Sequence, residues 1–353
     1  MKTIGVISTD WHIDESNQSE VYELVLKQVE IAKREGLSKI FCLGDVFDSR
    51  QKQSERVLNT FTSILEYLEV NNMYLICVPG NHDKTDYRGY RSFLSPFKNR
   101  PYFSLVEEFK VLENFEGTNT HVLLIPFYSE DEWLERLEEA SKFLEARGLR
   151  KGDTILMSHQ ALTGSVNNDG SKVENSIKPG MLSDFKAVFL GHYHDYQEIT
   201  ASIIHCPSIR QKNFGENPNK GYTLIKDTGE YDIELSEFKQ YYTMEYDASD
   251  LDPKFLEELK KEVKETDMHV RIKVKGEAKD VKSLDLNSLR AVGVKVEVKS
   301  PSIEKSVEEC NGEIEDYSSY KLLKELFEEF CESRKLDKEE GTRLLKLIVK
   351  ENE

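Results

Sequence analysis

Short apolar runs that end in aspartate, histidine or asparagine recur five times along this chain. The runs cover residues 3–9, 39–43, 73–77, 154–158 and 187–190. The polar residues that follow them are Asp10 and His12, then Asp45 and Asp48, then Asn81, His82 and Asp83, then His159, and finally His192 and His194. An apolar run of this length, stopped by turn residues, predicts a buried strand. Because ligands bind at the carboxyl ends of strands in open α/β sheets, we expect these side chains to converge on one edge of one sheet.

Five of the eight histidines stand at these strand ends. A lone histidine there is explained by ordinary hydrogen bonding, whereas five together indicate a metal centre. Nitrogen and oxygen ligands without thiolate suit manganese, iron, zinc or magnesium. Two carboxylates, one amide and four imidazoles suffice for two ions bridged by one carboxylate, and such a pair clamps an in-line displacement at phosphorus. Two divalent ions against Asp10 and Asp45 would leave a charge of about +2 for a phosphodiester.

Helical periodicity alternates with the strands, over residues 20–35, 54–69 and 130–146, so the fold class is α/β. At 353 residues the chain suggests more than one domain.

No apolar run is long enough for a membrane span, and the N-terminus enters a strand where a signal peptide would stand. Five scattered cysteines fit a reducing cytoplasm. The net charge of −17 disfavours loose attraction to nucleic acid but allows a locally positive site.

The ordered set of motifs resembles the calcineurin-like metallophosphoesterases. It consists of Asp10-x-His12, Gly44-Asp45-x-x-Asp48, Gly80-Asn81-His82-Asp83, His159 and Gly191-His192-x-His194. Within that superfamily, residues 44–48, 206–210, 214–216 and 220–222 resemble the SbcD-type DNA repair nucleases of bacteria and some bacteriophages. The resemblance is strong over residues 1–240. It implies a two-sheet metallophosphoesterase core flanked by helices, followed by a small α/β cap domain and a C-terminal helical segment that binds a partner.

The resemblance also implies roles for the residues of the motifs. One ion would be held by Asp10, His12, Asp45 and His194, and the other by Asp45, Asn81, His159 and His192. His82 would touch the scissile phosphate, and Asp83 would orient His82 or a loop amide. We expect Asp48 to be catalytic together with these two residues. A DNA contact is not assigned to it, because some relatives carry histidine at this position. We expect Mn²⁺ as the metal, with Mg²⁺ as the alternative, because imidazole ligands favour transition metals.

Residues 84–100 mix basic and aromatic side chains directly after the third polar cluster. Such a mixture grips phosphates and stacks on bases, although a solvated helix with its aromatics in the core is the alternative. The residues expected to contact DNA are Lys84, Arg88, Tyr90, Arg91, Arg210 and Lys212.

The chain after the core divides into three further parts. We expect a nuclease domain at 1–236, a DNA-binding cap domain at 237–300 and an acidic linker at 301–316. Residues 317–353 read as two short helices whose apolar stripes carry Tyr320, Leu323, Leu326, Phe327, Phe330, Leu344, Leu345 and Ile348. By resemblance these stripes bind an SbcC-type, SMC-like ATPase subunit. Docking on the chain's own body is the alternative.

Together these features predict a metal-dependent DNA nuclease, the nuclease subunit of an SbcC-type ATPase complex in DNA repair, recombination and replication. By resemblance it is a 3'-5' double-strand exonuclease and a single-strand or hairpin endonuclease. It would work as a homodimer within a heterotetramer, in the cytoplasm of a bacterium or a phage-infected cell. A phosphoesterase acting on a small molecule or a phosphoprotein, a nucleotide or lipid pyrophosphatase, and a metal-free scaffold on the same fold are the alternatives.

Overall fold

The computed structural model describes residues 1–167, 170–266 and 268–299. Two compact units are present. One consists of Met1–Thr243 with Val263–Arg271, and the other of Met244–Glu262 with the described residues from Ile272 onward. The linker predicted at 301–316 and the helical segment predicted at 317–353, with all of its apolar stripe residues, lie outside the described residues. Across the described part, no helix is both long and apolar enough to span a membrane.

The first unit contains a six-stranded sheet that begins with the N-terminal strand. Its order is β12 (Tyr231–Leu235), β11 (Gly221–Lys226), β1 (Thr3–Ser8), β2 (Lys39–Cys42), β3 (Tyr74–Cys77) and β4 (Phe103–Leu105). The strands β1 to β4 pair in parallel, and β11 joins β1 in the antiparallel direction. The carboxyl ends of β1, β2 and β3 therefore meet at one edge.

A second six-stranded sheet completes the core. Its order is β5 (Lys110–Leu112), β6 (His121–Ile125), β7 (Thr154–His159), β8 (Ala187–Gly191), β10 (Ile203–His205) and β9 (Gln197–Thr200). The strands β6, β7 and β8 are parallel. One expectation was wrong here: the five strands do not share one sheet, since three lie in the first and two in the second. Buried parallel strands have the same apolar pattern in either sheet, so the pattern alone does not assign them.

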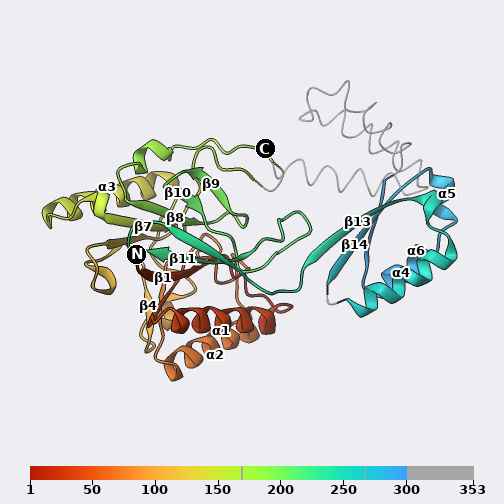
Figure 1. Ribbon diagram of the computed structural model, residues 1–353, viewed down its shortest axis with the longest axis horizontal. Helices are drawn as coiled ribbons and strands as arrows, with labels where there is room; N and C mark the ends of the chain where they lie inside the picture. Colours follow the sequence, from red (N-terminus) through yellow and green to blue (C-terminus); the bar gives the residue numbers. More distant parts are fainter. Residues whose placement is uncertain (168–169, 267, 300–353) are drawn as a thin grey trace, which may run out of the picture. The chain divides into compact units, whose positions relative to one another are not determined.

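The two sheets pack face to face and helices cover their outer faces. Between them lies an apolar cluster that includes Ile7 and Phe41 of the first sheet and Met157 and Phe189 of the second. The helices α1 (Gln18–Arg34) and α2 (Glu55–Val70) lie side by side against the first sheet, and α3 (Glu130–Ala146) covers the second (Figure 1). All three predicted helices are confirmed to within two residues.

Local signals fix the ends of these helices. The hydroxyl of Ser54 accepts a hydrogen bond from the amide of Val57 and caps α2. After α1 the chain turns at Gly36, whose φ of +73° lies in the left-handed region that glycine occupies without strain. Helix α1 therefore ends and helix α2 begins at defined residues.

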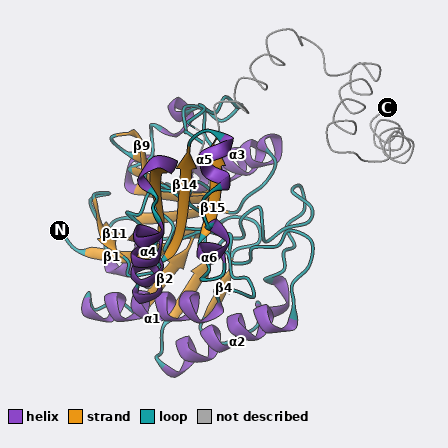
Figure 2. Cartoon of the chain, turned by 90° about the vertical axis from the view of Figure 1, so that its right-hand side faces the viewer, coloured by secondary structure: helices purple, strands orange, loops and turns teal. Residues whose placement is uncertain are grey.

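A small α/β module over residues 241–299 contains the described part of the second unit (Figure 2). Its sheet has the order β13 (Tyr241–Asp247), β14 (His269–Lys275) and β15 (Lys295–Lys299). Its helices are α4 (Pro253–Glu265), α5 (Ala278–Lys282) and α6 (Leu286–Arg290). Alternate residues Val270, Ile272 and Val274 of β14 are buried. This alternation is typical of a strand with one face on a core. The domain boundary predicted at 236/237 and the DNA-binding role of this module stay predictions.

Candidate metal centre

The polar loops at the strand ends have an unusual backbone. Asp10, His12, Asp45 and His192 have positive φ values of +54°, +46°, +53° and +97°. Such conformations are costly for residues other than glycine, and they cluster at functional sites where the surroundings enforce them. Glycine makes the close approach of the loops feasible, because a Cβ on Gly80 would lie 2.2 Å from Oδ1 of Asp45. The tight packing of the loops thus fixes the functional side chains.

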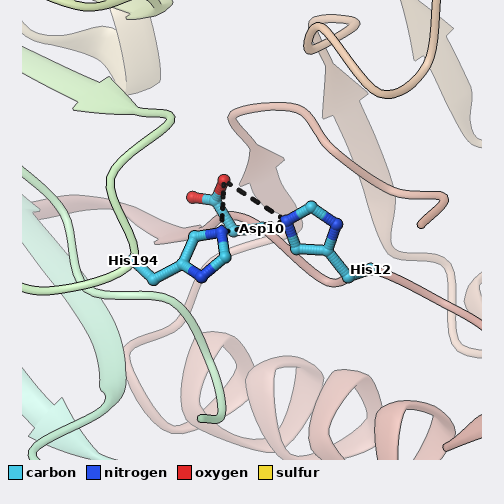
Figure 3. A group of neighbouring side chains, drawn as sticks. All are labelled: Asp10, His12 and His194. Atoms are coloured by element: carbon cyan, nitrogen blue, oxygen red, sulfur yellow. Dashed lines mark hydrogen bonds and ion pairs between the residues drawn. The ribbon is translucent and has the colours of Figure 1, made fainter. Parts of the chain in front are cut away.

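Asp10, His12 and His194 form the first cluster of donor atoms and point toward one another (Figure 3). The Nε2 atoms of the two histidines are 3.0 Å apart, and they lie 4.0 and 3.9 Å from Oδ1 of Asp10. The other carboxylate oxygen of Asp10 accepts a hydrogen bond from the hydroxyl of Thr9 at 2.7 Å. Oδ1 is buried and accepts no hydrogen bond from any described residue. Two imidazole nitrogens and an orphaned carboxylate oxygen around one point are a fitting donor set for a divalent ion.

Asp45, Asn81, His159 and His192 make up a second cluster at the junction of the two sheets. Oδ1 of Asn81 lies 3.0 Å from Nε2 of His159 and 2.9 Å from Nδ1 of His192. Nε2 of His159 is 3.5 Å from Oδ1 of Asp45, whose Oδ2 is 3.6 Å from Nε2 of His12 in the first cluster. Asp45 therefore faces both clusters, as the predicted bridging ligand would. The division of the seven ligands between two ions stays a prediction.

A hydrogen bond from one ring nitrogen of a histidine leaves the other ring nitrogen available to a metal. Nδ1 of His159 donates to the carbonyl oxygen of Leu43 at 2.6 Å, so its Nε2 faces the carboxylate of Asp45. Burial lowers the pKa of His159, but the charge and hydrogen bond of Asp45, with smaller contributions from Asp10 and Leu43, together outweigh burial and raise that pKa to about 9. Burial lowers the pKa of His12 to about 4 and of His192 to about 3, which keeps their lone pairs available. The oxygens of Asp45 and Asn81 therefore favour a positive charge between them, and a divalent ion would supply that charge.

His82 stands beside the first cluster in a fixed orientation. Its amide donates to Oδ1 of Asp45 at 2.8 Å, and its Nδ1 donates to the carbonyl oxygen of Asp48 at 2.5 Å. The ring meets His12 edge-on, with 4.6 Å between centroids. His12, Asp48 and His82 form a further candidate metal group, but the Asp48 carboxylate already pairs with the ammonium of Lys212. The other ring nitrogen of His82, Nε2, lies 2.9 Å from the guanidinium of Arg50.

Asp83 is fully buried and holds two loops together. Its carboxylate accepts hydrogen bonds from the amides of Gly80, Val46 and Phe47 at 2.9, 3.2 and 3.0 Å. It therefore spans from its own loop to the Asp45 loop. It thereby fixes the amides on both sides of the gap between the two loops, and its expected part in catalysis stays a prediction.

Two of the expected DNA contacts are wrong. Lys84 is 0% exposed, and its ammonium donates to the carbonyl oxygens of Gly89 and Phe127 at 3.0 and 2.7 Å. Arg210 is 6% exposed and pairs with Glu20 at 2.6 Å. A basic residue between aromatic residues has the same sequence appearance whether it faces a core or solvent, and only the fold separates the two cases. Arg88, Tyr90 and Arg91 are exposed and Lys212 is partly exposed, so their DNA contacts stay predictions.

Glu216 was not assigned a role from the sequence, yet it contacts a proposed ligand directly. Its Oε1 accepts a hydrogen bond from Nδ1 of His194 at 2.8 Å, and its Oε2 pairs with Lys220 at 3.0 Å. The resemblance named the segment that contains Glu216 but gave no reason to place this carboxylate behind a histidine 22 residues earlier. Sequence spacing carries no signal for a contact of this range.

The chain is similar in sequence to known phosphoesterases and nucleases. The family model for calcineurin-like phosphoesterases matches residues 4–196. A DNA double-strand break repair protein Mre11 from Nanoarchaeum equitans is 24% identical over 201 residues, covering 52% of this chain and 53% of that protein. Exonuclease subunit 1 of Enterobacteria phage T4 is 23% identical over 199 residues, covering 54% of each. The chain thus spans about half the length of these curated relatives.

Solved structures give weaker similarities. A dimetal phosphatase from Danio rerio has a TM-score of 0.38 and 14% identity, covering 58% of this chain and 87% of that one. The nuclease MPE from Pseudomonas putida has a TM-score of 0.27 and 12% identity, covering 55% and 63%.

Proposed function

This chain belongs to the calcineurin-like phosphoesterase family, and from that premise we propose that it is a metal-dependent DNA nuclease. One observation carries the proposal: the Asp45 carboxylate faces two clusters of nitrogen and oxygen donors at once. That arrangement suits two divalent ions bridged by one carboxylate, the centre that hydrolyses phosphodiesters. The names of both curated relatives, a break-repair protein and an exonuclease subunit, favour DNA as the substrate.

The residues of the chain divide the work of hydrolysis among them. Asp10, His12, Asp45 and His194 would hold one ion, and Asp45, Asn81, His159 and His192 the other. When bound, the two ions would polarise the phosphodiester and make the attacking water more acidic. His82 is held by Asp45 and Asp48, so its ring meets the substrate in one orientation. The tight loops hold all of these groups in place before the substrate arrives, which lowers the cost of orienting them.

The partner and the cap belong to the same proposal. We infer that the α/β module after the core contacts DNA, and that the chain works with an SbcC-type ATPase as a homodimer within a heterotetramer. The apolar stripes of residues 317–353 are the proposed docking segment. The double variant Leu326→Glu with Phe330→Glu tests it: co-purification with the ATPase should be lost while manganese-dependent cleavage persists. Intact co-purification would exclude these stripes as the docking site.

One assay tests the proposed activity. Purified protein with Mn²⁺ is incubated with end-labelled duplex DNA, with a DNA hairpin, with bis-p-nitrophenyl phosphate and with a phosphoprotein. We expect shortening of the duplex and opening of the hairpin, both abolished by a chelator. Hydrolysis of the phosphoprotein alone would contradict a nuclease and favour a phosphatase of the same family.

A further inference from the structure

Arg50 lies at the edge of the metal centre with its positive charge uncompensated by any carboxylate of the described residues. It is exposed, and its guanidinium meets Nε2 of His82 at 2.9 Å. Some arginines of the core unit pair with acids, as Arg34 does with Glu234 and Arg147 with Glu113, and among the described residues Arg50 does not. In a chain with a net charge of −17, an arginine beside the active site without an acidic partner is suited to an anionic ligand.

The carboxylate of Asp48, the residue whose carbonyl oxygen holds His82, is already engaged. Asp48 pairs with Lys212, and its Oδ1 is 3.3 Å from Nδ1 of His12. Its carbonyl oxygen accepts the hydrogen from Nδ1 of His82, so Nε2 is the nitrogen that turns toward Arg50.

Two contacts connect the first cluster to Arg50. His12 belongs to the first cluster, the His82 ring packs edge-on against it with 4.6 Å between centroids, and Arg50 contacts the far nitrogen of His82. Arg50 is therefore linked to the first cluster through His82. An anion held by Arg50 would lie beside the phosphate that His82 is proposed to touch.

We propose that Arg50 binds the phosphate next to the scissile phosphate on the same strand, so that the site favours polynucleotides over isolated phosphodiesters. The inference rests on the proposed nuclease function and names the part of the substrate that Arg50 recognises. A guanidinium matches a phosphate with two parallel hydrogen bonds, which an ammonium does not. Consecutive phosphates are the feature shared by every nucleic-acid strand and absent from a small phosphodiester.

The test removes the proposed contact between Arg50 and the phosphate in two ways, by changing the substrate and by changing the arginine. The substrates are short single-stranded DNAs with one labelled cleavage position, in which the linkage on its 5' or its 3' side is an uncharged methylphosphonate. Cleavage in Mn²⁺ is measured as kcat/KM for the wild type, Arg50→Gln and Arg50→Lys. Arg56→Gln, which changes an exposed arginine on α2, is the matched control.

For the wild type we expect one of the two methylphosphonates to lower kcat/KM by about tenfold or more, because the charge-assisted contact with Arg50 is lost. Arg50→Gln should lower it similarly on all-phosphate DNA and show no further loss with that methylphosphonate, because both changes remove one interaction. Arg50→Lys should keep part of the preference for all-phosphate DNA over the methylphosphonate, and Arg56→Gln should keep all of that preference.

Two results would overturn the inference alone: losses that multiply when the variant meets the methylphosphonate, or an Arg50→Gln enzyme that cleaves like the wild type. Failure of the wild type to cleave all-phosphate DNA would instead overturn the proposed function, and the inference with it.

Discussion

Nδ1 of His194 donates its hydrogen to Oε1 of Glu216 across 2.8 Å, and this contact decides which ring nitrogen His194 turns toward Asp10. The carboxylate is itself held by Lys220 and by the side chain of Asn213. With Nδ1 engaged, the lone pair of Nε2 is left for the first cluster. Partners of this kind fix the tautomer and raise the basicity of a ligating histidine.

Glu216→Gln should therefore weaken Mn²⁺ binding and lower DNA cleavage by about 10–100-fold. A glutamine in this place can present its NH₂ group to Nδ1, which reverses the direction of the hydrogen bond and turns the protonated nitrogen toward the metal. Calorimetric titration of the metal-free protein with Mn²⁺ measures the first effect. Glu230→Gln, at an exposed turn, is the control. Unchanged Mn²⁺ affinity in Glu216→Gln would show that this carboxylate does not set the tautomer.

The same carboxylate predicts how the metal-free protein responds to acid. Burial raises the pKa of Glu216, but the hydrogen bond and charge of His194 outweigh burial and lower that pKa from 4.5 to about 2. The folded state thus binds fewer protons at this group than the unfolded state between these values. Its stabilisation is fully present above about pH 4.5 and is lost as the pH falls toward about 2. Urea unfolding across this range should show a smaller decline for Glu216→Gln than for the wild type, and equal declines would contradict the linkage.

Lys84 should contribute to stability and not to DNA binding. Its ammonium satisfies two buried carbonyl oxygens and lies 3.7 Å from the centre of the Tyr128 ring. Lys84→Met leaves both carbonyls unpaired and should lower the free energy of unfolding by about 2–4 kcal/mol. Urea denaturation measures this loss, and Arg88→Met, at an exposed position, should show almost none. Full stability with weakened DNA affinity in Lys84→Met would place its ammonium on the DNA after all.

Mn²⁺ should support faster cleavage than Mg²⁺. Four imidazoles surround the predicted ion pair, and Mg²⁺ prefers oxygen ligands and retains its waters. The rates are compared on one preparation after trace metals have been removed with a chelating resin. Cleavage at equal or higher rates in Mg²⁺ alone would count against the imidazole-rich ligand set.

The sequence predicts local structure and the residues at the strand ends well, because both depend on residues that are close together in the chain. Helix α3 begins and ends at the predicted residues, and β2 and β3 lead directly into the loops of Asp45 and Asn81. The proposed ligands could be named because each stands at or just after the end of an apolar run, in a motif that resembles the calcineurin-like metallophosphoesterases.

Pairings between distant segments were not predictable in the same way. The five strands divide between two sheets, and nothing in the runs 39–43 and 154–158 distinguishes one sheet from the other. Lys84 is buried because Phe127, 43 residues later, supplies a carbonyl oxygen for its ammonium. Glu216 and Arg50 acquire their importance only through contacts with His194 and His82. In each case the deciding interaction joins residues whose separation carries no periodic signal.

Metal stoichiometry and DNA cleavage, measured together on the wild type, His82→Asn and His159→Ala, test the two-metal nuclease most directly. His82 lies beside the clusters without belonging to the predicted ligand set, whereas His159 faces both Asn81 and Asp45. We predict two Mn²⁺ ions per wild-type chain with cleavage, two ions without cleavage in His82→Asn, and the loss of one ion and of cleavage in His159→Ala. Loss of metal from His82→Asn, or full metal content and cleavage in His159→Ala, would contradict this assignment of roles.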